Sequence, residues 1–367
     1  MFTLKNGSIA ACLFACLAFT SCQKEEIDPQ NQPAATFNAA PVLANVATNV
    51  ITATYVDLDQ QAARLQAAVR ALAAAPTPAA FAAARQAYRD TRQPWETTEA
   101  FAFGPVSTQG LDGIIDTWPL DVTGLDALLA SSDSLTANSL RQKSGVLQGF
   151  HPIEYLLFGT AANKALADFT PREYLYLTAS AVNLKRATGQ LLAAWQPTGG
   201  NFAARLATAG PGNTFYPSQR RAVQELLDGV MGAATELPDS KIEGPLAAQS
   251  TDLEEAKYSQ NSKAEFLGNL GGIENIYFGR YGQAAPAGPG LQTMVQAKAP
   301  ALDARFRQEL ADAQAAVAAI PGRFDEAIFR NPAAVRAAQA KIRVVQATLT
   351  GDVQAVVKGF TLPYYFC

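Results

Sequence analysis

The chain has 367 residues, of which 49% are hydrophobic and 17% are charged. This length is enough for about two or three domains with sizeable cores. The formal net charge is -3 and no long basic run occurs, which argues against a nucleic-acid partner and against a cationic helix that lies on a membrane surface.

Residues 1–21 have the pattern of an export signal. Lys5 supplies a positive charge, and Ile9–Phe19 is an apolar run that is too short to anchor stably across a bilayer. Small residues then precede Cys22, as in a bacterial lipoprotein cleavage site. We expect residues 1–21 to be removed and Cys22 to be lipidated, which would tether the protein to the cell envelope. An ordinary secretory signal is the alternative.

Residues 22–40 are rich in Gln, Asn, Pro and Ala, and this composition predicts a flexible tether. Its beginning, Gln23-Lys24-Glu25-Glu26, resembles the acidic export signal of bacterial surface lipoproteins. We therefore expect the outer membrane, on its periplasmic or its outer face. Removal of the signal and lipidation of Cys22 would leave Cys367 as the one free thiol, so neither a disulfide nor a thiolate metal cluster is expected.

Apolar residues recur at helical spacing over 42–72, and a second helix follows Pro78. We expect Pro94 to kink or restart the chain, with a short helix over residues 95–103. Residues 104–121 are rich in Gly and Pro and are predicted to form a long loop. A loop of this length inside a compact domain is usually functional or disordered, and its aromatic and acidic content argues against disorder.

The remaining segments are helical as well. A capping box at Thr170–Glu173 starts a helix that ends near Trp195. Further helices are expected over residues 122–130, 136–148, 218–236, 262–279, 300–319, 332–350 and 352–360. No alternating strand pattern of useful length occurs, so we predict an all-α fold of helical bundles.

The segment Gly149–Gly159, with the sequence GFHPIEYLLFG, contains His151, the only histidine of the chain. Pro152 suits a first helical turn, and Glu154 follows His151 by three residues, so both side chains would lie on one face of a helix. The pair could bind one metal ion. The alternative is a buried, hydrogen-bonded histidine beside a carboxylate that stabilises the helix dipole by ~0.3–1 kcal/mol.

A second segment, Asn269–Gly279, repeats this pattern with Ile-Glu and Phe-Gly at the same spacing. Glu274 corresponds to Glu154, whereas Gly271 stands where the first copy has His151. We therefore predict two pseudo-repeated helical-bundle halves, residues 41–195 and 196–367. Either both glutamates are part of the scaffold, or both carboxylates face one site at the interface.

Two acidic segments precede the histidine motif. In the first, Glu96 and Glu99 follow Arg92 and share a helical face; in the second, Asp116 and Trp118 belong to the sequence IDTWPLD. Each segment has a simpler interpretation. Glu96 would be an exposed helix carboxylate, and Asp121 at the end of the second segment would cap a turn.

Taken in order, these motifs resemble the imelysin-like family, also called the M75 peptidase family. Its hallmark Gly-x-His-x-x-Glu falls on Gly149, His151 and Glu154. The resemblance implies an all-helical protein of two bundle-like halves that is exported, often lipid-anchored and linked to iron uptake. It also implies a metal ion at His151 and Glu154, and some members are described as metallopeptidases.

A conventional zinc peptidase is not expected, because the motif His-Glu-x-x-His is absent and one histidine cannot supply a two-histidine site. An oxygen-rich site with one imidazole suits harder ions. We therefore predict a divalent or iron ion at His151, Glu154, Glu99 and Asp116, with Arg92 and Trp118 as supporting residues.

The leading hypothesis is an envelope-anchored, metal-binding accessory protein of iron uptake, with other envelope proteins of that process as partners. One alternative is an M75-type metallopeptidase in which His151 and Glu154 are catalytic. Another is a non-catalytic interaction module whose surface around Trp95 and Trp118 binds another envelope protein.

Overall fold

The computed structural model describes residues 36–282 and 285–362. The predicted signal peptide, Cys22, most of the predicted tether and Cys367 lie outside these residues. The all-α prediction is confirmed for the described part, where the only extended pairing is a single parallel bridge between Thr36 and Thr361. Among its helices, none combines the length and apolarity that a membrane crossing requires.

Residues 36–207 form ten α-helices, and the predicted capping box at Thr170 starts the longest of them. They are α1 (Ala40–Asn45), α2 (Ala53–Ala74), α3 (Pro78–Thr98), α4 (Pro105–Thr108), α5 (Asp112–Ile115), α6 (Val122–Ala130), α7 (Ala137–Leu140), α8 (Phe150–Phe158), α9 (Pro171–Trp195) and α10 (Phe202–Ala207).

The second half continues with α11 (Gln219–Glu236), α12 (Glu243–Ala248), α13 (Ser262–Phe278), α14 (Leu291–Lys298), α15 (Pro300–Ala318), α16 (Phe324–Arg330), α17 (Pro332–Thr348) and α18 (Gln354–Lys358). Within the described residues, three π-helical segments join consecutive helices without a break in the helical backbone. They are Val46–Thr52, Leu237–Ile242 and Leu349–Val353. Such segments are rare in proteins, and those that occur often lie at functional sites.

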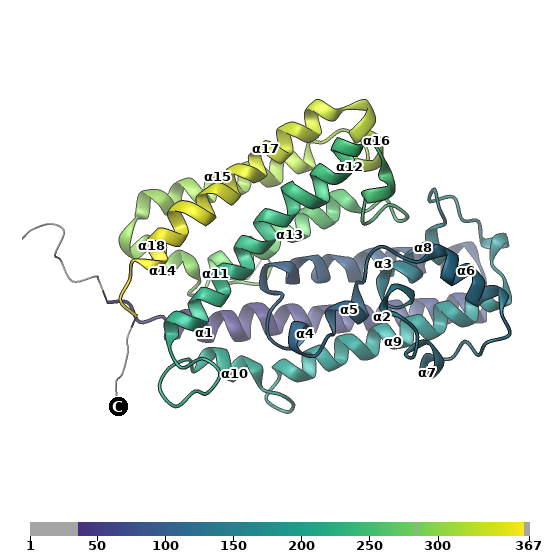
Figure 1. The fold of residues 1–367 in the computed structure, drawn as a ribbon, viewed down its shortest axis with the longest axis horizontal. Helices are drawn as coiled ribbons and strands as arrows, with labels where there is room; N and C mark the ends of the chain where they lie inside the picture. Colours follow the sequence, from purple (N-terminus) through teal and green to yellow (C-terminus); the bar gives the residue numbers. More distant parts are fainter. Residues whose placement is uncertain (1–35, 283–284, 363–367) are drawn as a thin grey trace, which may run out of the picture. The chain divides into compact units, whose positions relative to one another are not determined.

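Helices α2, α3 and α9 pack together, and α11, α13, α15 and α17 form a second group beside them (Figure 1). The two groups meet where α13 lies against α3. Two glycines of α13 permit this approach: a Cβ at Gly268 would lie 2.8 Å from the Glu96 Cβ, and one at Gly272 would lie 2.3 Å from the Thr97 carbonyl oxygen. The repeat of two halves stays a prediction.

Several local expectations were wrong. The chain does not restart at Pro94, because α3 runs through it to Thr98 and continues as a 3₁₀ turn over Glu99–Phe101. Residues 104–121 are not one loop, since they contain the short helices α4 and α5. The expected helix 136–148 is only α7 and a 3₁₀ turn over Gly145–Leu147.

The predicted tether ends earlier than residue 40. The rings of Phe37 and Phe360 are in tilted contact with centroids 5.2 Å apart, and the Phe37 N–H donates to the Thr361 carbonyl at 3.1 Å. Ala39 is buried, and its N–H donates to the Gln219 side chain at 2.7 Å. The last residues of the predicted tether are therefore part of the folded structure.

Candidate metal centre

Gly149 fixes the start of α8 next to the end of α5. It has a φ of 78°, and a Cβ at this position would lie 2.1 Å from the Ile115 carbonyl oxygen. Glycine is the residue that tolerates both constraints. Because Asp116 directly follows Ile115 and His151 is the second residue of α8, this contact brings the two side chains together.

The His151 side chain is only 1% exposed and lies between two carboxylates. Its Nδ1 is 3.3 Å from Glu154 Oε2, and its Nε2 is 3.2 Å from Asp116 Oδ1. The Nε2 contact has poor hydrogen-bond geometry, so this buried nitrogen has no hydrogen-bond partner among the described residues. Burial alone would lower the pKa of His151, but Asp116 and Glu154 outweigh it and raise the pKa to about 10.

Glu154 is held on both sides. While Oε2 faces His151, Oε1 accepts hydrogen bonds from the Ser259 N–H at 2.8 Å and from the Ser259 hydroxyl at 2.7 Å. Arg89 in turn donates to the Ser259 carbonyl at 3.0 Å. Both oxygens of Glu154 are thus in use, and the carboxylate orients the imidazole through Nδ1.

Arg92 of α3 is buried at the centre of four carboxylates. It donates to Asp116 Oδ1 at 2.7 Å, to Glu255 Oε1 at 3.1 Å and to Glu265 at 2.9 and 3.1 Å, and it also contacts Glu96 one helical turn away. Burial would raise the pKa of the Asp116 carboxyl, but Arg92 and His151 hold it well below its usual range.

Lys241 enters the same region from the π-helical segment after α11. Its Nζ lies 2.9 Å from Glu96 Oε2, 3.0 Å from Glu255 Oε2 and 3.6 Å from Glu99 Oε1. Burial raises the pKa of Glu96 to about 7, although Lys241 and Arg92 act in the opposite direction. Five buried or half-buried carboxylates therefore surround three basic side chains. We call this set the ion cluster: Arg92, Glu96, Asp116, His151, Glu154, Lys241, Glu255 and Glu265.

Two groups of three side chains in the ion cluster bring ligand atoms within 4.8 Å of one another. The group Glu96, Glu255 and Glu265 already surrounds the Arg92 guanidinium. The group Asp116, His151 and Glu255 contains a histidine whose Nε2 lies 3.2 Å from Asp116 but makes no hydrogen bond to any described residue. One imidazole and two carboxylates suit iron or manganese, so the second group fits a metal ion.

The structure brings together most of the residues predicted for the site. Arg92 and Asp116 join His151 and Glu154, and Trp95 donates from Nε1 to Asp116 Oδ2 at 2.5 Å. Glu99 is not in either ligand group and instead faces a cavity beside Lys241, with 24% of its side chain exposed. Trp118 lines the same cavity.

Two simpler interpretations have opposite outcomes. Asp121 does cap a turn, because it accepts the Gly124 N–H at 2.8 Å at the start of α6. Glu96 is not an exposed helix carboxylate, since it is fully buried between Arg92 and Lys241 and accepts from Asn269 at 2.9 Å. Glu274 lies with other partners: Arg280 at 3.0 Å and Gln314 at 2.7 Å.

Sequence reasoning missed Lys241, Glu255, Ser259 and Glu265. Glu255 lies 163 positions from Arg92 in the chain, in a short connection that carries no motif. Acidic residues in such connections are usually solvated, and no local pattern distinguishes this one. Lys241 had one usable signal, since Pro238 in the middle of a helical stretch marks an irregular helix.

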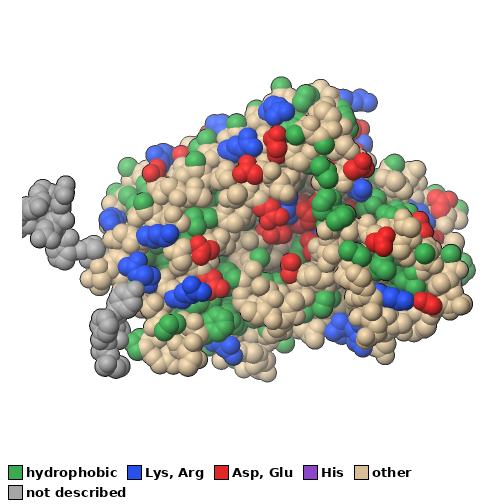
Figure 2. Space-filling model, viewed as in Figure 1, with side chains coloured by type: hydrophobic (Ala, Val, Ile, Leu, Met, Phe, Trp, Pro, Cys, Tyr) green, Lys and Arg blue, Asp and Glu red, His purple; other side chains and the backbone are tan. Residues whose placement is uncertain are grey.

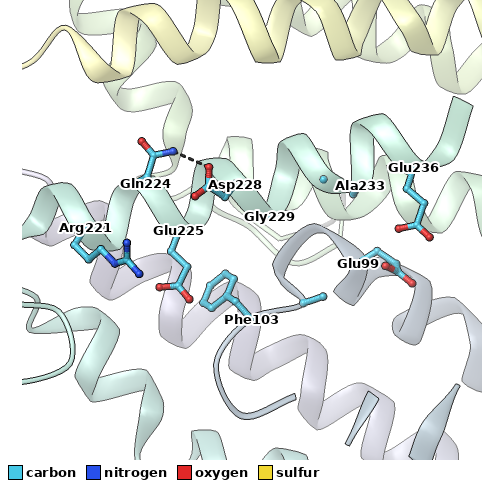
Figure 3. A pocket seen from close by; sticks show the side chains of 11 residues that line it. Glu99, Phe103, Arg221, Gln224, Glu225, Asp228, Gly229, Ala233 and Glu236 are labelled. Carbon is cyan, nitrogen blue, oxygen red and sulfur yellow. Dashed lines mark hydrogen bonds between the residues drawn. The ribbon is translucent and has the colours of Figure 1, made fainter. Parts of the chain in front are cut away.

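A cavity of about 580 Å³ opens beside the ion cluster and is lined by Asp116, Lys241 and Glu255. Acidic side chains gather at the centre of the face shown in Figure 2. A second cavity of about 420 Å³ follows α11 (Figure 3) and shares Glu99, Ala102 and Glu236 with the first.

The fold and the site together define the class of protein. It is an all-α protein in which two groups of helices hold a buried ion cluster with a candidate metal centre. The Imelysin family (Peptidase_M75) matches residues 51–350, and this chain belongs to that family. Iron-regulated protein A of Synechococcus elongatus is 34% identical over 313 residues, which are 84% of each chain.

Two solved structures share the fold. A candidate iron-regulated protein A precursor from Parabacteroides distasonis has a TM-score of 0.80 and 23% identity, over 90% of this chain and 99% of that one. An imelysin-like protein from Psychrobacter arcticum has a TM-score of 0.73 and 16% identity, over 91% of this chain and 100% of that one. At these identities the likeness concerns the fold alone.

Proposed function

We propose that this protein binds a divalent or iron ion through Asp116, His151 and Glu255 and serves iron uptake as an accessory protein of the cell envelope. The observation that supports the site most directly is the buried Nε2 of His151, which has no hydrogen-bond partner and faces two carboxylates. The iron-related role rests on the relative from Synechococcus elongatus, whose name describes it as iron-regulated.

Each side chain has a defined role in this proposal. His151 supplies Nε2, and Glu154 fixes the ring from the other side through Nδ1, as carboxylates commonly do for metal-binding histidines. Arg92 and Trp95 position Asp116, whereas Lys241 and Arg92 position Glu255. Glu154 of the family hallmark therefore orients His151 and does not bind the ion itself, whereas Glu255 is a ligand in its place. A bound ion would require His151 to lose its proton.

The test is a calorimetric titration of the metal-depleted protein with Mn²⁺ and, under anaerobic conditions, with Fe²⁺. Mutation of a residue that hydrogen-bonds to a metal ligand typically weakens metal binding by ~10–100-fold. We expect His151→Ala and Glu255→Gln, which remove proposed ligands themselves, each to weaken binding by more than this. Glu274→Gln is the matched control, because this buried glutamate lies with other partners. Unchanged affinity in both site variants would refute the proposed centre.

Attachment to the envelope is part of the same proposal and rests on the lipoprotein-like segment that ends at Cys22. We expect Cys22→Ala to move the protein from the outer-membrane fraction to a soluble fraction. Retention of the variant in the membrane would contradict lipid attachment at this cysteine.

A peptidase is the second candidate, because the 580 Å³ cavity leaves room for a substrate next to the proposed ligands. Burial raises the pKa of Glu99 in this cavity to about 8, which suits a general base. Cleavage of a protein substrate that is stopped by a chelator and by Glu99→Gln, while Mn²⁺ binding persists in that variant, would establish this activity.

A further inference from the structure

The first described residues lie beside the last ones, and basic side chains surround this place. Thr36 pairs with Thr361 in a parallel bridge. Arg220 donates to the Phe360 carbonyl at 2.7 Å, and the Lys298 Nζ lies 5.3 Å from the centroid of the Phe360 ring. The chain therefore enters the folded structure between basic side chains.

Five basic side chains at this end of the molecule come from four different helices. We call them the basic end: Arg205 of α10, Arg220 and Arg221 of α11, Lys298 of α14 and Lys358 of α18. None of the five makes an ion pair with a residue that the structure describes, whereas Arg305 of α15 pairs with Asp352. Several Lys and Arg side chains gather at the left end of the face shown in Figure 2. Because they are scattered along the chain, no basic run in the sequence indicates this surface.

The positive charge is confined to this end. The chain as a whole has a formal net charge of -3. On α11, Glu225 and Asp228 follow Arg221 by one and two helical turns and line the cavity of about 420 Å³. The basic end is therefore a local feature that a partner with the opposite charge would recognise.

An exposed aromatic side chain lies next to the basic end. Phe215 precedes α11, and 40% of it is exposed. Its ring contacts the Phe202 ring with centroids 4.9 Å apart, and the Arg205 guanidinium lies 5.8 Å from its centroid. Aromatic rings beside cations suit the headgroup region of a bilayer, where the ring contacts acyl chains and the cations pair with anionic lipids.

The proposed lipid attachment at Cys22 limits how far this end can be from a bilayer. Cys22 and Thr36 are 14 positions apart. Since a chain spans at most ~3.3–3.6 Å per residue, the basic end lies within ~50 Å of the attached lipid. The opposite end, at α16, is further away (Figure 1), because the helical backbone over Pro332–Lys358 is unbroken and ~40 Å long.

We propose that the basic end is a membrane-contacting face, which binds the anionic phospholipids of the bilayer to which Cys22 is attached and places Phe215 among their acyl chains. Basic side chains near a membrane surface are attracted to anionic lipids. Helices α15 and α17 then lead away from the bilayer. This orientation rests on the proposed lipid attachment, but the affinity of the face for anionic lipid does not.

The experiment measures sedimentation of the mature chain, residues 22–367, with vesicles. This chain contains every described residue. Cys22→Ala removes the site of lipid attachment from this parent chain, so that binding reports on the basic end alone. One set of vesicles contains equal parts of phosphatidylglycerol and phosphatidylcholine, and the other contains phosphatidylcholine only. Failure of lipid attachment in cells would therefore leave this measurement unaffected.

Arg205→Gln, Arg221→Gln and Lys358→Gln each remove one charge at an exposed position. Arg330→Gln is the matched control, because Arg330 is exposed, makes no ion pair with a described residue and ends α16 at the opposite end of α17. Arg205→Lys keeps the charge and separates its effect from that of the side-chain shape.

We expect the parent chain to bind the anionic vesicles more tightly than the neutral ones, and added salt to weaken this binding. Each charge-removing variant of the basic end should bind the anionic vesicles roughly fivefold more weakly. Phe215→Ala should weaken binding roughly tenfold through the loss of buried apolar surface. Arg330→Gln and Arg205→Lys should bind as the parent chain does.

The proposal is overturned if the parent chain binds neither set of vesicles or binds both equally well. It is also overturned if Arg330→Gln weakens binding as much as the variants of the basic end. Binding that occurs only after Glu25, Glu26 and Asp28 are neutralised would mean that the chain's own acidic segment covers the face, and this too would overturn the proposal.

Discussion

Helices α8 and α13 carry the same pattern of Ile-Glu and Phe-Gly and use it for different purposes. In both, the isoleucine is fully buried, the glutamate is buried, and a glycine with positive φ ends the helix, with φ of 75° at Gly159 and 63° at Gly279. Both helices pack against α3. The shared pattern therefore describes how the last turns of a buried helix are packed and ended.

The two glutamates face different surroundings. Glu154 lies in the ion cluster with His151 and Ser259, whereas Glu274 pairs with Arg280 and Gln314 beside a separate cavity. A carboxylate at a repeated position is therefore insufficient for a metal site. Convergence with side chains from other helices decides its chemistry.

The positions of His151 and Pro152 are occupied by Gly271 and Gly272 in the second segment. Gly272 faces the Thr97 carbonyl of α3 so closely that no side chain fits, while Gly271 points into open space. The second segment thus serves close helix packing at the place where the first carries the imidazole of the candidate site.

The largest expected effect concerns the imidazole that only the first segment has. The folded-state pKa of His151 is raised from 6.5 to about 10, so its stabilisation is complete below pH 6.5 and is lost as the pH rises through 10. In metal-free protein, the difference in free energy of unfolding between the native chain and His151→Gln should fall by on the order of 4 kcal/mol over this window. Urea denaturation at several pH values measures it. If the stability difference between the native chain and His151→Gln does not change with pH, the raised pKa of His151 is contradicted. The same holds if Glu274→Gln shows an equal change in stability with pH.

The second prediction concerns the two adjacent glycines. Gly272→Ala places a Cβ 2.3 Å from the Thr97 carbonyl oxygen and should lower the free energy of unfolding by about 3 kcal/mol. Gly271→Ala meets no neighbouring atom and should raise it by about 0.5–1 kcal/mol, because alanine favours a helix. Thermal and urea unfolding of both variants check this. Similar stability of the two would show that α13 can move away from α3 at little cost.

The smallest expected effect compares the two glutamates in metal binding. Glu154→Gln should lower affinity for Mn²⁺ by roughly 10–100-fold, because the amide no longer holds the imidazole as a carboxylate does. Glu274→Gln should not change it. Calorimetric titration of both variants gives the comparison, and equal losses would mean that the two glutamates act only through the stability of the fold.

Local physical rules made much of the fold predictable. The capping box at Thr170 did start a helix, and the glycines that flank the histidine motif did bound α8. The restart expected at Pro94 was wrong, because α3 runs through this residue where α13 packs against it. Tertiary packing can outweigh the local cost of a proline. A short stretch of sequence gives no information about this packing.

The candidate site was predictable only in part. His151 and Asp116 stood out because each belongs to a dense local motif, and their proximity follows from the contact between Gly149 and Ile115. Glu255 and Lys241 have no such motif, and their roles arise from packing of the second group of helices against the first.

By itself, the sequence determined the long helices and most of their ends, the helix that carries His151 and the family to which the chain belongs, because propensity, capping and motif order act over short distances. The tertiary structure decided which carboxylates share the site, that Glu154 supports the histidine, and that Glu274 lies elsewhere. These outcomes depend on which helix faces converge, and glycines such as Gly272 set how closely the helices approach.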